Sequence, residues 1–336
     1  MIREFSEINL LDRNSFHVEQ RAARLIEFDR WEDLHTLFTT QRPERWMVLS
    51  GGNNILFTQD YDGVILTPVA RGIELLRKEG DEVLVRVEAG VEWDDLVAWA
   101  VAHELWGIEN LSLIPGKVGA APVQNIGAYG CEAKDVIERV LGYDTELCTY
   151  TALTRAECAF GYRDSFFKRA LKGRWIITAV EIRLSLRANP QLGYGDVARE
   201  VEARGGATLK NIREAISNIR RSKLPDTNLL GNAGSFFKNP VVERSVAERL
   251  LVTYPDMPHY PAADPDCIKL AAGWLIDRAG LKGTRCGAVG VHDRQALVLV
   301  NHGGATGSEV IAFAHHVIRT VKERFGIEIE PEVNII

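Results

Sequence analysis

The 336-residue sequence lacks several features that would assign it at once. Its five cysteines are odd in number and widely spaced, without a Cys-x-x-Cys pair, so neither a disulfide framework nor a zinc site is indicated. The eight histidines show no metal-ligand spacing, because adjacent His315 and His316 on a helix would point about 100° apart. We therefore expect free thiols, as in a reducing cytoplasm, and no bound metal.

Long apolar runs and an excess of basic residues are also lacking. No segment approaches the ~18 apolar residues of a membrane span, and the N-terminus carries acidic residues early without the apolar core of a signal peptide. The formal net charge of −6 argues against a general nucleic-acid binder, whose footprint is a basic face. We expect a cytoplasmic protein with neither a membrane nor a nucleic acid as partner, in which local groups can still hold a small anion.

Length and element order indicate an α+β protein of two or three domains. The chain is too long for one typical core, and strand-like and helix-like segments follow one another without regular βαβ alternation. An apolar stripe at helical spacing and the loop after it predict a boundary near residues 205–225. Thr306 and Glu309 form a capping box that predicts the start of a long helix. Periodicity further predicts strands over residues 46–49, 55–57, 83–87, 176–186 and 296–300, and helices over residues 93–101 and 209–219.

The most informative segment is residues 114–130, which is rich in glycine and alanine and carries one charge, Lys117. Small residues let backbone N–H groups approach a ligand, and successive amides form an anion site without basic side chains. The segment is therefore typical of a diphosphate cradle, although a buried connection between two elements has the same composition. Residues 50–54 form a second candidate cradle, with an ordinary hairpin as the alternative, and two such loops suit one long ligand such as a dinucleotide.

Two other motifs, at residues 193–198 and at Arg163, admit both a functional and a structural interpretation. Gly193-x-Gly195-x-x-Ala198 has the dinucleotide spacing but no preceding strand, which favours a turn that presents Tyr194. Arg163 is either a solvated loop residue or a planar guanidinium that holds a carboxylate or an enolate.

The segment over residues 220–240 joins a basic cluster to a Gly-Asn-Ala-Gly-Ser turn. Lys223 is suited to a phosphate and Ser235 to proton transfer, whereas the structural alternative is a solvated helix end followed by a loop serine. No Ser-His-Asp arrangement surrounds Ser235, which disfavours an acyl-transfer role. The chain ends on strand-like residues 330–336, where a glutamate is ordinarily exposed and without a function.

Together these segments resemble the UDP-N-acetylenolpyruvoylglucosamine reductase family, the Mur B flavoenzymes of peptidoglycan precursor synthesis. Tyr260 is similar to the substrate-loop tyrosine of the family's longer type. The resemblance covers nearly the whole chain through Asn14-Ser-Phe, residues 50–57 and 114–130, Gly161-Tyr-Arg-Asp-Ser, Lys223-Leu-Pro-Asp, residues 231–240 and 271–277, and Glu332-Val333.

The resemblance implies a two-subdomain FAD-binding fold of the vanillyl-alcohol-oxidase-like type and a C-terminal α/β substrate-binding domain. The implied FAD-binding subdomains span residues 1–69, joined by a C-terminal strand over 328–336, and residues 70–208. The implied substrate-binding domain spans residues 222–327. We expect a monomer whose small-molecule partners are a UDP-sugar and NADPH.

The implied reaction passes hydride from NADPH to non-covalently bound FAD and then to C3 of the enolpyruvyl group, with protonation at C2. By this resemblance Ser235 donates the proton, and Arg163 and Glu332 stabilise the enolate-like intermediate, which preorganised positive groups and donors favour. The implied FAD-binding residues are Ser50, Gly51, Gly52, Asn53, Asn54, Pro115, Gly116, Gly119, Gln124, Asn125, Gly127, Ala128 and Tyr129. The implied contacts with the UDP-sugar or the nicotinamide nucleotide are Tyr162, Tyr194, Lys223, Asn239, Tyr260, Lys282 and Gln295.

Three residues depart from the family's common pattern. Ser50 and Asn53 stand where Gly and Ser are common, and Asn334 stands where Arg is frequent. Because backbone N–H groups form the cradle, we expect FAD binding to survive these changes.

Two other functions compete with this one. A flavin oxidase of the same superfamily is disfavoured because the first loop lacks the His or Cys that often tethers flavin there. A non-catalytic UDP-sugar or flavin-binding protein is disfavoured by the intact set Arg163, Ser235 and Glu332.

Overall fold

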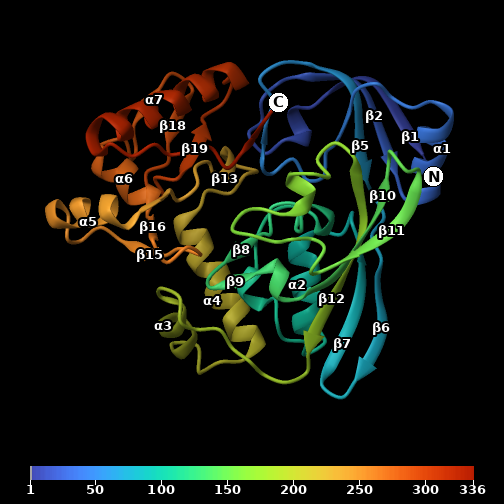
Figure 1. Ribbon diagram of the computed structural model, residues 1–336, viewed down its shortest axis with the longest axis horizontal. Coiled ribbons are helices and arrows are strands. Elements are labelled where there is room, and N and C mark those ends of the chain that lie inside the picture. Colours follow the sequence, from blue (N-terminus) through green and yellow to red (C-terminus); the bar gives the residue numbers. More distant parts are fainter. Residues whose placement is uncertain (1) are drawn as a thin grey trace. The chain divides into compact units, whose positions relative to one another are not determined.

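The computed structural model describes residues 2–336, which form two compact units (Figure 1). The chain crosses between the units several times, finally between Ser222 and Lys223. Among the described residues, no helix is long and apolar enough to cross a membrane. Unit 1 contains the described part of Met1–Ile8, Ala22–Gly51 and Tyr61–Ser222, and unit 2 contains Asn9–Arg21, Gly52–Asp60 and Lys223–Ile336.

The first sheet of unit 1 has the strand order β1-β2-β5-β3, and β5 pairs in parallel with both β2 and β3. Helix α1 (Trp31–Thr40) follows β2 and buries Leu34, Leu37 and Phe38 in one core with apolar residues of β2 and β5. The strands are β1 (Arg3–Asn9), β2 (Arg21–Phe28), β3 (Trp46–Val48) and β5 (Tyr61–Pro68).

The second sheet of unit 1 is antiparallel, with the order β11-β10-β12-β7-β6. Its inner face packs against α2 (Trp93–Ala102), whose Trp93, Leu96 and Val97 are buried in one core with apolar residues of this sheet. The strands predicted over 83–87 and 176–186 and the helix predicted over 93–101 are confirmed. The strands are β6 (Ile73–Glu79), β7 (Glu82–Glu88), β10 (Ile137–Asp144), β11 (Thr149–Thr154) and β12 (Trp175–Ser185), and a small β8 (Gly127–Ala128) pairs with β9 (Cys131–Glu132).

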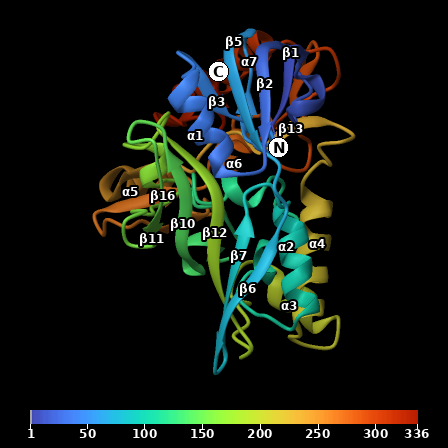
Figure 2. The same cartoon turned by 90° about the vertical axis from the view of Figure 1, so that its right-hand side faces the viewer.

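The last helices of unit 1 are α3 (Val197–Glu202) and α4 (Leu209–Lys223). The predicted apolar stripe of α4 is buried at Ile212, Ile216 and Ile219, which confirms the helix predicted over 209–219. Helix α4 runs alongside α2 (Figure 2), and the polar side of α4 provides arginines that bond to Asp94 of α2 and to the Leu113 carbonyl.

Unit 2 contains a four-stranded sheet with the order β13-β19-β18-β17 and a three-stranded sheet with the order β14-β16-β15. Helices α6 and α7 lie beside the larger sheet (Figure 1). The strands are β13 (Gly231–Ser235), β14 (Val241–Glu243), β15 (His259–Pro261), β16 (Cys267–Leu270), β17 (Arg285–Cys286), β18 (Val289–Val291) and β19 (Val298–Asn301). The helices are α5 (Arg244–Thr253), α6 (Ala272–Arg278) and α7 (Gly307–Phe325).

The predicted capping box of α7 is confirmed. The Thr306 hydroxyl accepts from Glu309 N at 3.2 Å, and the Glu309 carboxylate accepts from Thr306 N at 2.8 Å. A glycine is needed at the first position of the helix, because a Cβ on Gly307 would lie 1.8 Å from the Phe57 carbonyl oxygen.

The strand pairing excludes one alternative and corrects one prediction. Residues 50–54 do not form a hairpin, because β3 pairs with β5 whereas β4 (Ile55–Leu56) pairs in parallel with β20 (Asn334–Ile335). The predicted turn over Gly231–Ser235 is strand β13, which pairs with β19 through an irregular register. Glycine and asparagine suggested a turn there, but Gly234, with φ of +68°, is accommodated as a kink within the strand.

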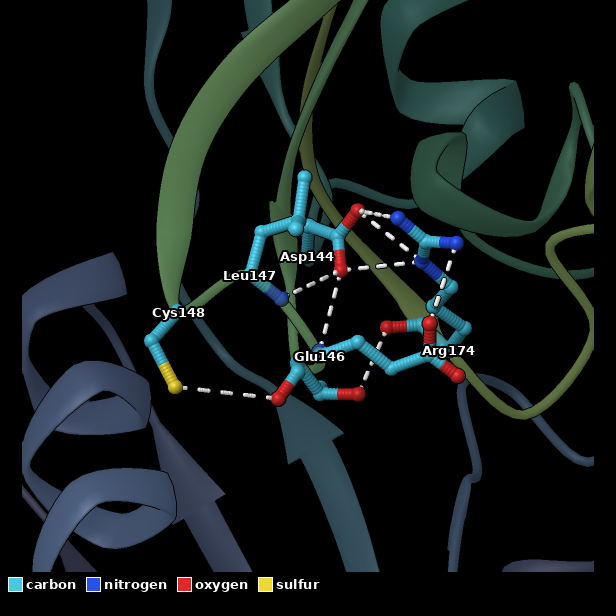
Figure 3. A network of polar contacts seen from close by, with 6 residues as sticks. Asp144, Glu146, Leu147, Cys148 and Arg174 are labelled. Carbon is cyan, nitrogen blue, oxygen red and sulfur yellow. Dashed lines mark hydrogen bonds and ion pairs between the residues drawn. The ribbon is translucent and has the colours of Figure 1, made fainter.

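A polar network closes the turn between β10 and β11 (Figure 3). The Arg174 guanidinium binds the buried Asp144 carboxylate through Nε at 3.0 Å and Nη2 at 2.6 Å. The N–H groups of Glu146 and Leu147 donate to the same carboxylate at 3.0 and 3.1 Å. Burial raises the pKa of Asp144, but these hydrogen bonds outweigh burial and hold the pKa below its ordinary value.

We expect Asp144→Asn to lower the free energy of unfolding by about 2–3 kcal/mol at pH 7, because Arg174 loses the buried one of its two charged partners. Because the pKa of Asp144 is lower in the folded state, its carboxylate stabilises the fold at pH values above the unfolded-state pKa of about 3.9. This stabilisation disappears as the pH falls through the folded-state pKa. Chemical denaturation at pH 7 and below pH 4 measures the difference. Glu146→Gln, at an exposed partner of Arg174, is the control. Equal stability of Asp144→Asn and the unaltered protein at pH 7 would contradict this account.

Candidate active site

The small-residue loop over residues 114–130 is packed against the end of β7 and the start of α2. Gly119 N donates to Ala89 O at 3.0 Å, and Val118 N donates to Val91 O at 2.8 Å. A Cβ on Gly119 would lie 2.6 Å from the Ala89 Cβ, so this approach requires glycine. The loop is therefore a fixed part of unit 1. Of its other predicted FAD-binding residues, Pro115 is exposed, whereas Gly116, Gln124, Gly127, Ala128 and Tyr129 are half-buried.

Asn125 holds the middle of this loop through its side chain. It is fully buried and has a left-handed backbone with φ of +47°. Its Nδ2 donates to Gly161 O at 3.0 Å and to the Glu132 carboxylate at 2.9 Å, while its Oδ1 accepts from Lys134 N at 3.0 Å. Both polar atoms of the side chain are thus hydrogen-bonded within the protein. The structural contribution of Asn125 is to fix the position of the loop.

The shorter loop over residues 50–54 has backbone donors available. Among residues 2–336, the N–H groups of Ser50, Gly51, Gly52 and Asn53 donate to no backbone carbonyl. The Ser50 hydroxyl is buried and has no hydrogen-bond partner in the described chain. A Cβ on Gly52 would lie 2.1 Å from Arg13 O, and Asn54 O accepts from Asn334 Nδ2 at 3.0 Å.

These features fit a diphosphate-bearing cofactor. Neither loop contains an acidic side chain, and backbone donors, a buried hydroxyl and glycines at sites of close approach are what a phosphate cradle requires. No group of three or more His, Cys, Asp or Glu residues within the described range is arranged to hold a metal ion.

Arg163 lies on a loop that is fastened to the 114–130 loop. Arg163 has a left-handed backbone with φ of +52°, a conformation found in strained functional segments. Its Nη2 donates to Gly127 O at 2.9 Å, and its guanidinium lies 5.7 Å from the centre of the Tyr162 ring. The buried Ser165 hydroxyl donates to Val123 O at 2.6 Å and ties the two loops together. The structure therefore brings predicted residues Tyr162, Arg163 and Gly127 together in unit 1.

Two further predicted residues of unit 1, Tyr129 and Tyr194, meet edge to face with ring centres 5.9 Å apart. Asn110, which is 1% exposed, bridges their segments because its Nδ2 donates to Tyr129 O at 2.9 Å and Gln191 O at 2.7 Å. Burial raises the pKa of Tyr129 despite the positive charge of Arg220 nearby. Burial also lowers the pKa of Arg220.

Sequence reasoning did not assign roles to Asn110, Arg213 or Arg220. A signal for them was present in each case. Asn110 is one of three polar residues, with Glu109 and Ser112, among the apolar residues before the loop. The two arginines lie seven residues apart on α4, off its apolar stripe. Such signals indicate that a polar side chain is buried and hydrogen-bonded, but they do not show which residue it binds.

In unit 2 the structure places Ser235 and Glu332 on neighbouring segments. Glu332 N donates to Phe236 O at 2.7 Å, Lys238 N donates to Glu330 O at 2.9 Å, and Phe237 pairs with Pro331. Phe236 and Phe237 are almost fully buried, so Ser235 is attached to a rigid support. Both Ser235 and Glu332 remain half-buried and can be reached from solvent.

The other predicted substrate contacts of unit 2 are distributed around α6. Asn239 Oδ1 accepts from Ala272 N at 3.0 Å, and Gln295 Oε1 faces Gly273, so both side chains lie at the start of this helix. Lys282 lies beyond its other end, paired with Asp277 at 3.0 Å. Tyr260 is partly exposed on β15 with the Lys269 ammonium 6.0 Å from its ring, and Lys223 is the exposed last residue of α4.

Family models match two parts of the chain. Residues 225–336 match the model described as UDP-N-acetylenolpyruvoylglucosamine reductase, C-terminal domain, and residues 28–146 match an FAD binding domain. The second match contains both small-residue loops.

Individual relatives match over nearly their whole length. The UDP-N-acetylenolpyruvoylglucosamine reductase of Chromobacterium violaceum is 50% identical, with 97% of each chain covered. That of Pseudomonas aeruginosa is 47% identical, with 96% of each chain covered. The crystal structure of the Thermus caldophilus reductase is 23% identical and superposes with a TM-score of 0.69 over 100% of this chain and 98% of that chain, which confirms the expected fold class. The chain therefore belongs to the UDP-N-acetylenolpyruvoylglucosamine reductase family of oxidoreductases with an FAD-binding domain.

Proposed function

We propose that this chain reduces UDP-N-acetylenolpyruvoylglucosamine to UDP-N-acetylmuramate in peptidoglycan precursor synthesis, with FAD as cofactor and NADPH as hydride donor. The activity named for relatives up to 50% identical supports this reaction. The structural observation that carries it is the pairing of the Ser235 and Glu332 segments, which puts a hydroxyl and a carboxyl on adjacent backbone.

The two small-residue loops would hold the cofactor. The proposed diphosphate donors are the N–H groups of Ser50, Gly51, Gly52 and Asn53, together with those N–H groups of the 114–130 loop that donate to no backbone carbonyl among the described residues. The Ser50 hydroxyl is an additional proposed donor. The chemistry that FAD supplies when bound is hydride transfer, from NADPH to the flavin and from flavin N5 to C3 of the enolpyruvyl group. Arg163, tied to Gly127, belongs to the same part of unit 1 as the second loop.

The proposed catalytic residues act on the charge that hydride addition leaves on C2 and the carboxylate. The Arg163 guanidinium binds the carboxylate oxygens in its planar fork and stabilises the enolate. Glu332, in its protonated form, donates a hydrogen bond to the same species, and the Ser235 hydroxyl gives its proton to C2.

The remaining expectations are proposed with this reaction. Tyr162, Tyr194, Lys223, Asn239, Tyr260, Lys282 and Gln295 are the proposed contacts of the UDP-sugar or the nicotinamide nucleotide. The proposed domain limits are residues 1–69 with 328–336, 70–208 and 222–327. The proposed enzyme acts as a monomer in the cytoplasm.

Anaerobic flavin absorbance tests the reaction directly. Adding NADPH is expected to bleach the flavin, and adding the enol ether is expected to restore the oxidised spectrum without oxygen. A spectrum that recovers only when oxygen is admitted would point to an oxidase. Protein purified and reconstituted without any flavin signal would remove the basis of the proposal.

We expect Ser235→Ala to reduce the rate of flavin reoxidation by the enol ether about 10²–10⁴-fold, because the proton donor to C2 is lost. Bleaching by NADPH should remain nearly normal, since it needs no proton from Ser235. Stopped-flow absorbance separates the two steps, and Ser245→Ala, at an exposed serine of α5, is the control. An equal loss in both steps would refute the proton-donor role.

Arg163→Lys should lower kcat/KM for the enol ether about 10- to 100-fold, because an ammonium lacks the planar fork that binds two carboxylate oxygens. Arg155→Lys, an exposed arginine of unit 1, is the matched control. Steady-state kinetics under saturating NADPH provide the comparison. Turnover of Arg163→Lys equal to that of the control would refute the carboxylate-binding role.

A further inference from the structure

Leu113 directly precedes the 114–130 loop and has a left-handed backbone with φ of +55°. This conformation is unfavourable for a residue with a large L side chain, so the surrounding structure must impose it. The backbone direction at Leu113 sets where Ile114, Pro115 and Gly116 begin. The proposed reaction assigns no role to this residue or to the side chains that bind it.

Both backbone polar groups of Leu113 are bound by charged side chains. The Asp94 carboxylate accepts from Leu113 N at 2.7 Å, and Arg220 Nε donates to Leu113 O at 3.2 Å. Arg213 donates two hydrogen bonds to Asp94, at 2.7 and 2.8 Å, and thereby fixes the carboxylate. We call Asp94, Arg213 and Arg220 the Leu113 clamp.

The first turn of α2 holds the residues on either side of Leu113. The Trp93 indole donates to Leu111 O at 3.1 Å, and Trp93 N donates to Gly116 O at 2.8 Å. Asp94 comes from the same turn, whereas Arg213 and Arg220 come from α4, which runs alongside (Figure 2). Two helices thus determine the path of the chain as it enters the loop.

We propose that the Leu113 clamp is a positioning device for FAD, with Asp94 as its principal residue. It holds Leu113 in the left-handed conformation and so places the backbone of Gly116 and the residues after it where the diphosphate binds. This inference rests on the proposed use of FAD. It assigns to Asp94, Arg213 and Arg220 a role in cofactor affinity without contact to substrate.

A second ion pair of unit 1 provides a matched comparison. Asp144 also binds an arginine, through hydrogen bonds from Nε and Nη2, and accepts from backbone N–H groups, but it closes the turn between β10 and β11. Loss of either aspartate removes the same kind of interaction. Only loss of Asp94 should therefore change FAD affinity beyond any effect on stability.

Solvent access makes the clamp testable by substitution. Asp94, Leu113 and Arg213 line a groove of about 480 Å³ between α2 and α4. The Asp94 and Arg213 side chains are 29% and 22% exposed. Burial raises the pKa of Asp94, but the hydrogen bonds from Arg213 and Leu113 N hold the pKa below its ordinary value, so Asp94 is charged at neutral pH. Water can hydrate groups left unpaired by a variant.

The experiment measures the dissociation constant of FAD from the reconstituted full chain by flavin fluorescence. We expect Asp94→Ala to weaken FAD binding roughly tenfold or more, the effect of losing one charge-assisted hydrogen bond. Asp94→Asn, which keeps an acceptor for Leu113 N, should lose less and serves if the alanine variant does not fold. Asp144→Asn should bind FAD within about twofold of the unaltered chain, because Asp144 closes the turn between β10 and β11. A twofold change in the dissociation constant corresponds to less than about 0.5 kcal/mol.

Leu113→Gly separates positioning from general stability. Glycine adopts a left-handed backbone without strain, so Asp94→Asn should weaken FAD binding less in a Leu113→Gly background than in the unaltered chain. Unchanged FAD affinity in folded Asp94 variants, an equal loss in Asp144→Asn, or an undiminished loss in the glycine background would each overturn the inference. An unaltered chain that binds no FAD would instead refute the proposed cofactor.

Discussion

A loop that binds phosphate through its backbone must have its shape fixed by other residues, and the rest of the site depends on this constraint. In unit 1 the groups that fix the 114–130 loop are buried polar side chains, one within the loop and two on neighbouring segments. Asn125 holds its middle, Ser165 joins it to the Arg163 segment, and Asn110 joins its end to the Tyr194 segment. The loop can therefore consist of small residues with almost no charge.

Unit 2 meets the same requirement with strand pairing in place of side-chain hydrogen bonds. The segments of Ser235 and Glu332 pair through their backbones, and the two phenylalanines after Ser235 are buried. The end of the chain pairs with β4, and Asn334 binds Asn54 O. Asn334 thus has a structural partner in the 50–54 loop. The side chains proposed to react, those of Ser235 and Glu332, are carried by segments whose main chains are already fixed.

Much of this was predictable because periodicity and capping act locally. The alternating valines of β7, the apolar stripe of α4 and the capping box of α7 each predict an element from residues that lie close together in the sequence. The strand at Gly231–Ser235 could not be predicted, because its pairing with β19 depends on residues far along the chain. The contacts of Asn110 and Arg213 could not be predicted for the same reason, since the sequence does not show which distant residue a buried polar side chain binds. Leu113 carried no sequence signal at all, because leucine rarely adopts a left-handed backbone.

The central claim, that backbone N–H groups of the two small-residue loops hold the cofactor, is tested most directly by hydrogen–deuterium exchange with and without FAD. Amides that bind a phosphate are protected from exchange, so residues 50–54 and 114–130 should slow when FAD is added. The strands of the three-stranded β14-β16-β15 sheet provide an internal reference that should not change. Slower exchange confined to the two loops and their direct neighbours is the predicted result. FAD binding that leaves both loops unprotected would contradict it.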